Sequence, residues 1–314
     1  MIEKIFKKVP AGNMMIPLFI TAILNSFFPE IFSIGKFTKH LFTSEGMVGL
    51  MTLNLTIAGT GLKAQNLGRA FKRTGVIAFA RIFLGIVIVF LVARFFGKEG
   101  IFGISLLALV CGILNHNNSV FISLNLEYGD ELDNAGAGVA GLVTGPFWAL
   151  LILGSSGMAD IPVLSMIDSL VPIIFGMVLG NIDEEFGQNL RKCQKYIIVF
   201  LGLSMGAGIN IFDIFKGGLS GIILGLIVIF VVGSFTVFVD RTINKRRGHA
   251  GWAISTTGAN AIAVPAIIAS IDKTWLPFLE VATAQVAASV ILTIILTPYI
   301  TNYWVKKHPE MDLK

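Results

Sequence analysis

Long apolar stretches that carry almost no charged residue constrain this chain more than any other feature. The clearest of them cover residues 75–95 and 218–239. A helix needs about 20 mostly apolar residues to cross the hydrocarbon core of a bilayer. Charged residues make up only 14% of the sequence, whereas about a quarter of the residues in soluble domains are charged. The sequence therefore predicts an all-α polytopic membrane protein whose apolar surplus contacts the lipid bilayer.

Further stretches of the same kind bring the predicted number of transmembrane helices to ten. The spans cover residues 11–28, 46–62, 75–95, 102–126, 136–154, 163–182, 196–212, 218–239, 251–271 and 276–299. Several spans have small residues four positions apart, such as Gly176 and Gly180. This spacing is typical of membrane helices that pack closely against each other.

The distribution of Lys and Arg predicts how these helices are oriented. If the spans alternate across the membrane, one side receives 17 basic residues and the other receives 6. Because cytoplasmic loops are enriched in basic residues, we expect both termini in the cytoplasm. We also expect the helices to lie in a bacterial inner membrane. The basic clusters occur between apolar runs, which is membrane topology and argues against a nucleic-acid partner. The acidic segment 127–133 falls on the cytoplasmic side and is expected to be a solvated loop.

The two halves of the chain, residues 1–155 and 156–314, have similar patterns. An offset of 143 residues relates the third span to the eighth, and it relates Asn117 in the fourth span to Asn260 in the ninth. Because each half has an odd number of helices, the second half must enter the membrane in the opposite orientation. Inverted repeats of this kind are common in transporters, with the substrate site near the membrane midplane where the repeats meet.

Polar clusters interrupt the fourth and ninth spans at matching positions. The polar residues are Asn115, His116, Asn117, Asn118 and Ser119 in the fourth span, and Ser255, Thr256, Thr257 and Asn260 in the ninth. Unwound backbone is costly in hydrocarbon, so such segments persist only where protein buries them or where they line a wet cavity. The half-helix that follows each break offers free N–H groups to an anion, and amides and hydroxyls can bind sugar hydroxyls. We predict a substrate site here; the alternative is that these side chains only bridge helices.

His116 is the only strongly titratable side chain at either break. It is therefore a candidate carrier of a coupling proton, although a simple hydrogen bond to a neighbouring carbonyl is the alternative. Thr144, Glu280 and Gln285 are the other candidates for ion coupling. Arg81 also lies within a span, but we expect its side chain to extend to the membrane surface.

No pattern in the sequence indicates an enzyme, a cofactor, a bound metal or an ATP-driven mechanism. The histidines are scattered, at His40, His116, His249 and His308. They lack metal-ligand spacing, and no Ser/His/Asp arrangement or P-loop occurs. Cys111 and Cys193 are expected to be free thiols. The sequence does not indicate an oligomeric state.

Several short motifs together resemble the 2-keto-3-deoxygluconate permease family. They are PAGNMMIPLF at 10–19, Tyr128-Gly129, Gly145-Pro146, LGNID at 179–183 and the Ser/Thr/Gly-rich break before Pro265. The resemblance runs over nearly the whole chain. It implies ten helices in two inverted five-helix repeats, similar to the bile acid sodium symporter fold, with broken helices 4 and 9 crossing each other. It also implies uptake of a keto-deoxy sugar acid by proton symport.

The sequence departs from the pattern of that family at two positions. Leu114 and Val143 stand where the family pattern has acidic residues, in helices four and five. Both changes bear on the coupling ion and on the substrate. Two alternatives therefore stay open beside a proton-coupled importer of a small anionic sugar acid. One is a sodium-coupled carrier of another organic anion, and the other is a membrane receptor or scaffold that does not transport.

Overall fold

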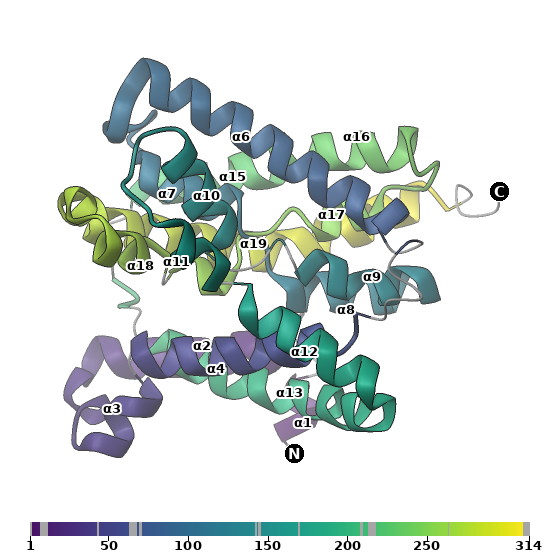
Figure 1. Cartoon of the computed structure of the whole chain (residues 1–314), viewed down its shortest axis with the longest axis horizontal. Coiled ribbons are helices and arrows are strands. Elements are labelled where there is room, and N and C mark those ends of the chain that lie inside the picture. The colour runs from purple at the N-terminus through teal and green to yellow at the C-terminus, as the bar shows by residue number, and fades with distance from the viewer. Residues whose placement is uncertain are drawn as a thin grey trace. The chain divides into compact units, whose positions relative to one another are not determined.

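The computed structural model describes residues 2–6, 12–42, 44–62, 68, 71–141, 143, 146–168, 170–207, 210–212, 218–262 and 264–309. In this part of the chain the regular structure is helical, and the only extended pairing is an isolated bridge between Ile101 and Ile104 (Figure 1). The predicted all-α class is confirmed. The chain divides into two compact units: unit 1 is Met1–Lys63 with Val171–Lys216, and unit 2 is Ala64–Leu170 with Gly217–Lys314.

Unit 1 contains short and medium-length helices that pack closely. Its elements are α1 (Ile2–Phe6), α2 (Gly12–Phe27), η1 (Pro29–Phe32), α3 (Lys36–Phe42), α4 (Ser44–Gly59), α12 (Val171–Ile182) and α13 (Glu184–Gly206). A side-chain carbon added at Gly176 or Gly180 would overlap the backbone carbonyl of Thr56 or Thr60 in the neighbouring chain segment. The spacing of these glycines thus allows the close packing that the sequence predicts.

Unit 2 holds the two interrupted helices. Its first segment forms η2 (Phe71–Gly75), α6 (Val76–Phe96), η3 (Gly97–Glu99), α7 (Leu106–Ile113), α8 (Asn118–Tyr128), α9 (Glu131–Gly141), α10 (Phe147–Ser155) and α11 (Val163–Asp168). Its second segment forms α15 (Gly218–Leu226), η4 (Ile227–Gly233), α16 (Ser234–Thr242), α17 (His249–Ala253), η5 (Ala259–Ile262), α18 (Val264–Ile271), η6 (Lys273–Trp275) and α19 (Leu276–Lys307). All residues of α7 are buried, so this half-helix lies in the core of the unit.

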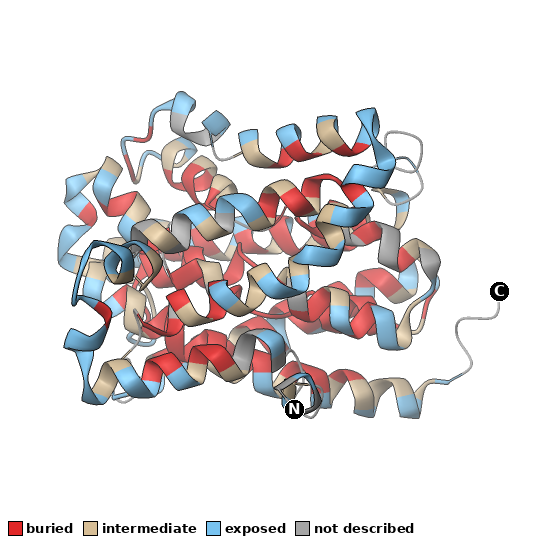
Figure 2. Ribbon diagram, turned by 90° about the horizontal axis from the view of Figure 1, so that it is seen from below, coloured by how far each residue is buried: buried red, intermediate tan, exposed pale blue. Residues whose placement is uncertain are grey.

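The outer helices of unit 2 have one buried and one exposed face. On α6, Ile82 and Val89 are buried, whereas Phe79, Phe83 and Phe90 are exposed. Figure 2 shows the same alternation of buried and exposed residues along many of the helices. An exposed face of large apolar residues suits lipid rather than water.

Three continuous helical runs among the described residues are long and apolar enough to cross a membrane: Phe71–Glu99, Gly218–Thr242 and Lys273–Lys307. They coincide with the predicted spans 75–95, 218–239 and 276–299. Other apolar helices in the described part of the chain are shorter, as in Val171–Ile182. The count of ten spans and the inverted orientation of the two halves therefore stay predictions.

Candidate functional site

The predicted interruption of the fourth span is present between α7 and α8. Helix α7 ends at Ile113, residues 114–117 are not helical, and α8 begins at Asn118. The side-chain Oδ1 of Asn117 accepts a hydrogen bond from the backbone N–H of Val120 at 3.2 Å. Asn is among the preferred residues for capping a helix N-terminus in this way. The polar cluster therefore ends one helix and starts the next.

The second interruption lies between α17 and α18. Helix α17 ends at Ala253, residues 254–258 are not helical, and α18 begins at Val264 after the short η5. Pro265 occupies the first turn of α18, where its missing N–H costs no helical hydrogen bond.

A row of hydroxyl side chains on α19 supports the second break. The backbone N–H of Thr257 donates to Thr293 Oγ1 at 2.9 Å, and the hydroxyl of Thr297 donates to the carbonyl of Ser255 at 3.2 Å. The hydroxyls of Thr257 and Ser289 are 2.7 Å apart. These contacts replace the hydrogen bonds that a continuous helix would provide. These hydroxyls could have been identified from the sequence, because Ser289, Thr293 and Thr297 are four residues apart and therefore lie on one face of a helix.

The two breaks lie against each other and are hydrogen-bonded. The N–H of Gly258 donates to the carbonyl of Asn115 at 2.6 Å, and the N–H of Asn117 donates to Thr256 Oγ1 at 3.0 Å. A side-chain carbon at Gly258 would lie 2.7 Å from the His116 carbonyl oxygen and would overlap Asn260 Oδ1. Only glycine allows the two backbones to approach this closely.

Arg81 on α6 joins the two breaks through its guanidinium group. Nη2 donates to the carbonyls of Thr256 at 2.9 Å and Gly112 at 3.4 Å, and Nη1 donates to the carbonyl of Ile254. The side chain is completely buried, so the expectation that it extends to the membrane surface is wrong. The carbonyls of Gly112 and Ile254 lie at the ends of α7 and α17, where the negative end of a helix dipole favours a cation, and together with the Thr256 carbonyl they replace water around the guanidinium.

The structure brings most of the predicted site residues together. Asn115, His116 and Asn117 in the first break, and residues 255–257 in the second, are at most 4% exposed. Asn118 begins α8, and half-buried Asn260 lies in η5 beside Gly258. The ring of His116 packs edge-on against Phe121, with 5.9 Å between the ring centroids. Its two nitrogens form no hydrogen bond of normal geometry with the described residues.

The other predicted residues lie elsewhere or outside the described part. Thr144 and the side chain of Ser119 are outside the described residues. Glu280 is exposed on α19. Gln285 is buried, but it lies at the N-terminal end of α7, where it accepts from the Ser105 N–H at 3.0 Å and donates to the Gly103 carbonyl at 2.6 Å. Gln285 therefore links α19 to the start of α7, away from the break.

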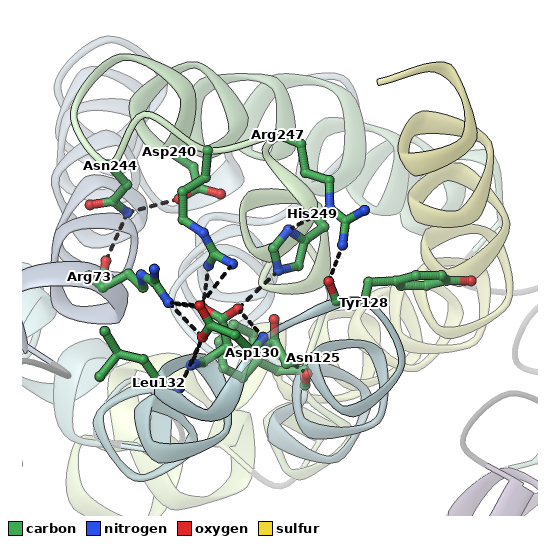
Figure 3. Close-up of polar contacts among 12 residues, drawn as sticks. Arg73, Asn125, Tyr128, Asp130, Leu132, Asp240, Asn244, Arg247 and His249 are labelled. Atoms are coloured by element: carbon green, nitrogen blue, oxygen red, sulfur yellow. Dashed lines mark hydrogen bonds and ion pairs between the residues drawn. The ribbon is translucent and has the colours of Figure 1, made fainter. Parts of the chain in front are cut away.

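Unit 2 also contains a partly buried cluster of charged and polar residues, which we call the ionic cluster: Arg73, Asp130, Asp133, Asp240, Asn244, Arg246, Arg247 and His249 (Figure 3). Arg73 Nη1 lies 2.6 Å from Asp130 Oδ1 and 3.5 Å from Asp133 Oδ1. Asp133 also pairs with Arg246, and its Oδ2 lies 3.2 Å from His249 Nε2. Asp133 is 1% exposed, so the prediction of a solvated loop over residues 127–133 is wrong at this position.

The ionic cluster shifts the ionisation of Asp133. Burial raises the pKa of its carboxyl, but the hydrogen bonds from His249 and Arg246 and the charge of Arg246 outweigh burial and hold that pKa well below its usual range. A carboxyl with a lowered folded-state pKa stabilises the fold above its unfolded pKa of about 3.9, and this contribution is lost as the pH falls through the folded pKa.

Asp133→Asn is therefore expected to lower the melting temperature at pH 7 by several degrees and to reduce the loss of stability in acid. Removing one member of a buried ion pair costs roughly 3–5 kcal/mol because the partner charge stays buried. Thermal unfolding of purified protein between neutral pH and about pH 3 tests this. Exposed Asp160 offers the control Asp160→Asn. An equal acid response in the wild type and Asp133→Asn would contradict the assignment.

The features above define a class of protein. An all-helical chain with lipid-facing apolar surfaces and two polar helix breaks, buried against each other, has the architecture of a membrane transporter. The sequence model of the 2-keto-3-deoxygluconate permease family matches residues 3–310. The chain belongs to that family, as the sequence motifs indicated. It is an integral membrane protein of a permease family and not an enzyme.

Curated relatives with permease names match this chain over almost its full length and almost their own. The chain is 38% identical over 306 residues to 2-keto-3-deoxygluconate permease 1 of Salmonella typhimurium, covering 98% of this chain and 96% of the relative. It is 32% identical over 322 residues to a 2-keto-3-deoxygluconate permease of an Enterobacter species, covering 100% and 97%. A permease of the same name from Escherichia coli O7:K1 is 31% identical over 313 residues, covering 98% and 95%.

Proposed function

We propose that this chain imports 2-keto-3-deoxygluconate, or a closely related sugar acid, across the bacterial inner membrane by proton symport. The names of the full-length relatives support the substrate. The observation that carries the proposal is the hydrogen-bonded pair of helix breaks, between Gly258 and Asn115 and between Asn117 and Thr256. In a membrane interior unwound backbone is tolerated only where protein buries it or where it lines a water-filled cavity, and polar groups at such places commonly belong to a transport path.

The chemistry of the breaks suits a sugar acid. Helix α8 begins at Asn118, so the positive end of its dipole lies at the first break, where it favours a carboxylate. The neighbouring amides and hydroxyls, from Asn115 to Ser119 and from Ser255 to Asn260, can bind substrate hydroxyls without adding a competing charge. Because the described residues of the breaks are almost completely buried, alternating access requires a motion that exposes them to each side in turn.

Proton coupling is favoured over sodium coupling by the position of Arg81. The carbonyls at half-helix ends are the groups that commonly coordinate Na⁺ in broken-helix transporters. Here Arg81 already donates to the carbonyls of Gly112, Ile254 and Thr256. A sodium ion at the same oxygens would be repelled by the guanidinium. We propose that the protonation of His116, which lies inside the site, affects the affinity for the substrate.

The proposal includes ten transmembrane helices in two inverted halves, residues 1–155 and 156–314, with both termini in the cytoplasm. The composition of the compact units supports a repeat. Apart from α11, each half contributes its earlier helices to unit 1 and its later helices to unit 2.

Uptake by purified protein in proteoliposomes tests the function. Labelled 2-keto-3-deoxygluconate is expected to accumulate under an imposed pH gradient, acidic outside, and not under a sodium gradient alone. Binding without uptake would favour a receptor, and sodium-driven uptake would favour the alternative carrier.

The variant His116→Gln is expected to bind substrate at least tenfold more weakly and to flatten the pH dependence of substrate affinity. The reason is that glutamine keeps a polar side chain but removes the titratable group. Substrate affinity measured between pH 5.5 and 8 checks this. His40→Gln, at an exposed histidine on α3, is the matched control. An unchanged pH profile in His116→Gln would show that protonation of His116 does not affect substrate binding and that its role is structural.

A further inference from the structure

Asp240 differs from the other acidic residues of the ionic cluster because its carboxyl forms no ion pair with a described residue, although Arg246 and His249 attract it from a longer distance. Its side chain is 0% exposed, and Oδ1 accepts one hydrogen bond, from Asn244 at 2.8 Å. Among the described residues, Oδ2 has no hydrogen-bond partner and the carboxyl forms no ion pair. A buried carboxylate with neither a cation nor a second donor is costly in a membrane protein, whereas a neutral carboxylic acid is tolerated.

The charged groups around Asp240 already have other partners. Arg73 in η2 pairs with Asp130 and Asp133, and Arg246 pairs with Asp133. Arg247 donates to the carbonyl of Tyr128 and, at 3.4 Å, to His249 Nδ1. His249 on α17 is directed with Nε2 toward Asp133, and Arg241 of α16 stacks over Trp304. Each of these contacts goes to a group other than the Asp240 carboxyl.

Two half-helices connect the ionic cluster to the breaks. Helix α8 begins at the first break and ends at Tyr128, which accepts from Arg247. Helix α17 begins at His249 in the cluster and ends at Ala253, beside the second break. At about 1.5 Å per residue, α17 is a rigid link of only about 8 Å. The cluster therefore contacts one end of each half-helix that borders the proposed substrate site, so a displacement of the cluster would displace both of them.

We propose that Asp240 is a proton-binding site outside the substrate site, and that the proton it carries is the one transported with the substrate. This inference rests on the proposed function. The proton binds at Oδ2, where it forms a neutral carboxylic acid, and it leaves to water when this end of unit 2 opens. The basic residues of the cluster belong to the side that the charge distribution places in the cytoplasm, so the proton leaves on that side. His116 lies within the breaks, so its protonation affects substrate affinity instead.

The variant Asp240→Asn separates coupling from transport, because asparagine resembles the protonated acid but cannot release a proton. In proteoliposomes, uptake of 2-keto-3-deoxygluconate driven by a pH gradient is expected to fall at least 20-fold. Exchange of labelled for unlabelled substrate at equal pH, which needs no net proton movement, is expected to stay within threefold of the wild type. Asp160→Asn is the control and is expected to keep both activities. Driven uptake and exchange that both match the wild type would overturn the inference.

A second variant covers the case in which Asp240→Asn does not fold. Asp240→Glu keeps a titratable group, and it is expected to retain driven uptake with a pH profile moved by at least half a unit. An unmoved profile would overturn the inference. If the wild type exchanges no 2-keto-3-deoxygluconate, the proposed substrate fails; if it exchanges but Asp240→Asn is still driven by the pH gradient, only the role of Asp240 fails.

Discussion

Replacing Arg81 with glutamine is expected to abolish measurable uptake, with a loss of at least 100-fold. The buried guanidinium holds the carbonyls of Gly112, Ile254 and Thr256, so it fixes the ends of α7 and α17 relative to each other. Hydrogen bonds to a charged group contribute about 1.5–3 kcal/mol each. A loss of about 3 kcal/mol in binding free energy corresponds to an affinity that is roughly 100-fold weaker. Uptake and exchange in proteoliposomes measure the effect.

Two further variants make the Arg81 result interpretable. Arg94→Gln, at an exposed arginine near the end of the same helix, is expected to transport normally. Arg81→Lys keeps the charge but lacks the planar fork that reaches several carbonyls, so a partial loss is expected. Wild-type uptake and thermal stability in Arg81→Gln would show that the guanidinium is not needed at the breaks.

Gly258→Ala is expected to reduce substrate affinity and uptake at least tenfold while the protein still reaches the membrane. The added methyl group would collide with the His116 carbonyl and with Asn260, and it would separate the two breaks. Overpacking of this kind costs about 1–3 kcal/mol. Substrate binding to purified protein and uptake in proteoliposomes check this expectation.

The matched control for Gly258 is a glycine with free space around it. A side-chain carbon at Gly49 in α4 would meet nothing within 4 Å, so Gly49→Ala is expected to be neutral or slightly stabilising. If Gly258→Ala bound substrate as tightly as Gly49→Ala, the contact between the breaks would not be required for binding.

The sequence predicted the helix breaks because their causes are local. Polar side chains such as Asn117 cap a following helix, and Pro265 marks the start of one. The same local signals gave the long apolar spans, since length and apolar content alone define them. The orientation and number of the spans depend on how the shorter helices lie in a membrane, and that stays a prediction.

The predictions from the sequence were wrong for residues whose burial depends on partners far away in the chain. Arg81 is separated by 173 residues from Ile254, whose carbonyl it binds, and nothing near Arg81 in the sequence reveals this contact. Asp133 looked like part of an acidic loop because its partner Arg246 lies 113 residues away. A lone arginine in a long apolar run was nevertheless a signal, because intramembrane charges are costly and are commonly functional.

The buried hydroxyls along α19 repeat at a constant spacing. Ser289, Thr293, Thr297 and Thr301 are all buried and recur at every fourth position. Four residues of an α-helix rise about 6 Å and turn about 400°, so an axial step of about 6 Å with a rotation of about 40° brings each hydroxyl to the position of the next one. The second break, which is hydrogen-bonded to Thr293 and Thr297, would then meet the same kind of oxygen atom one position further along α19.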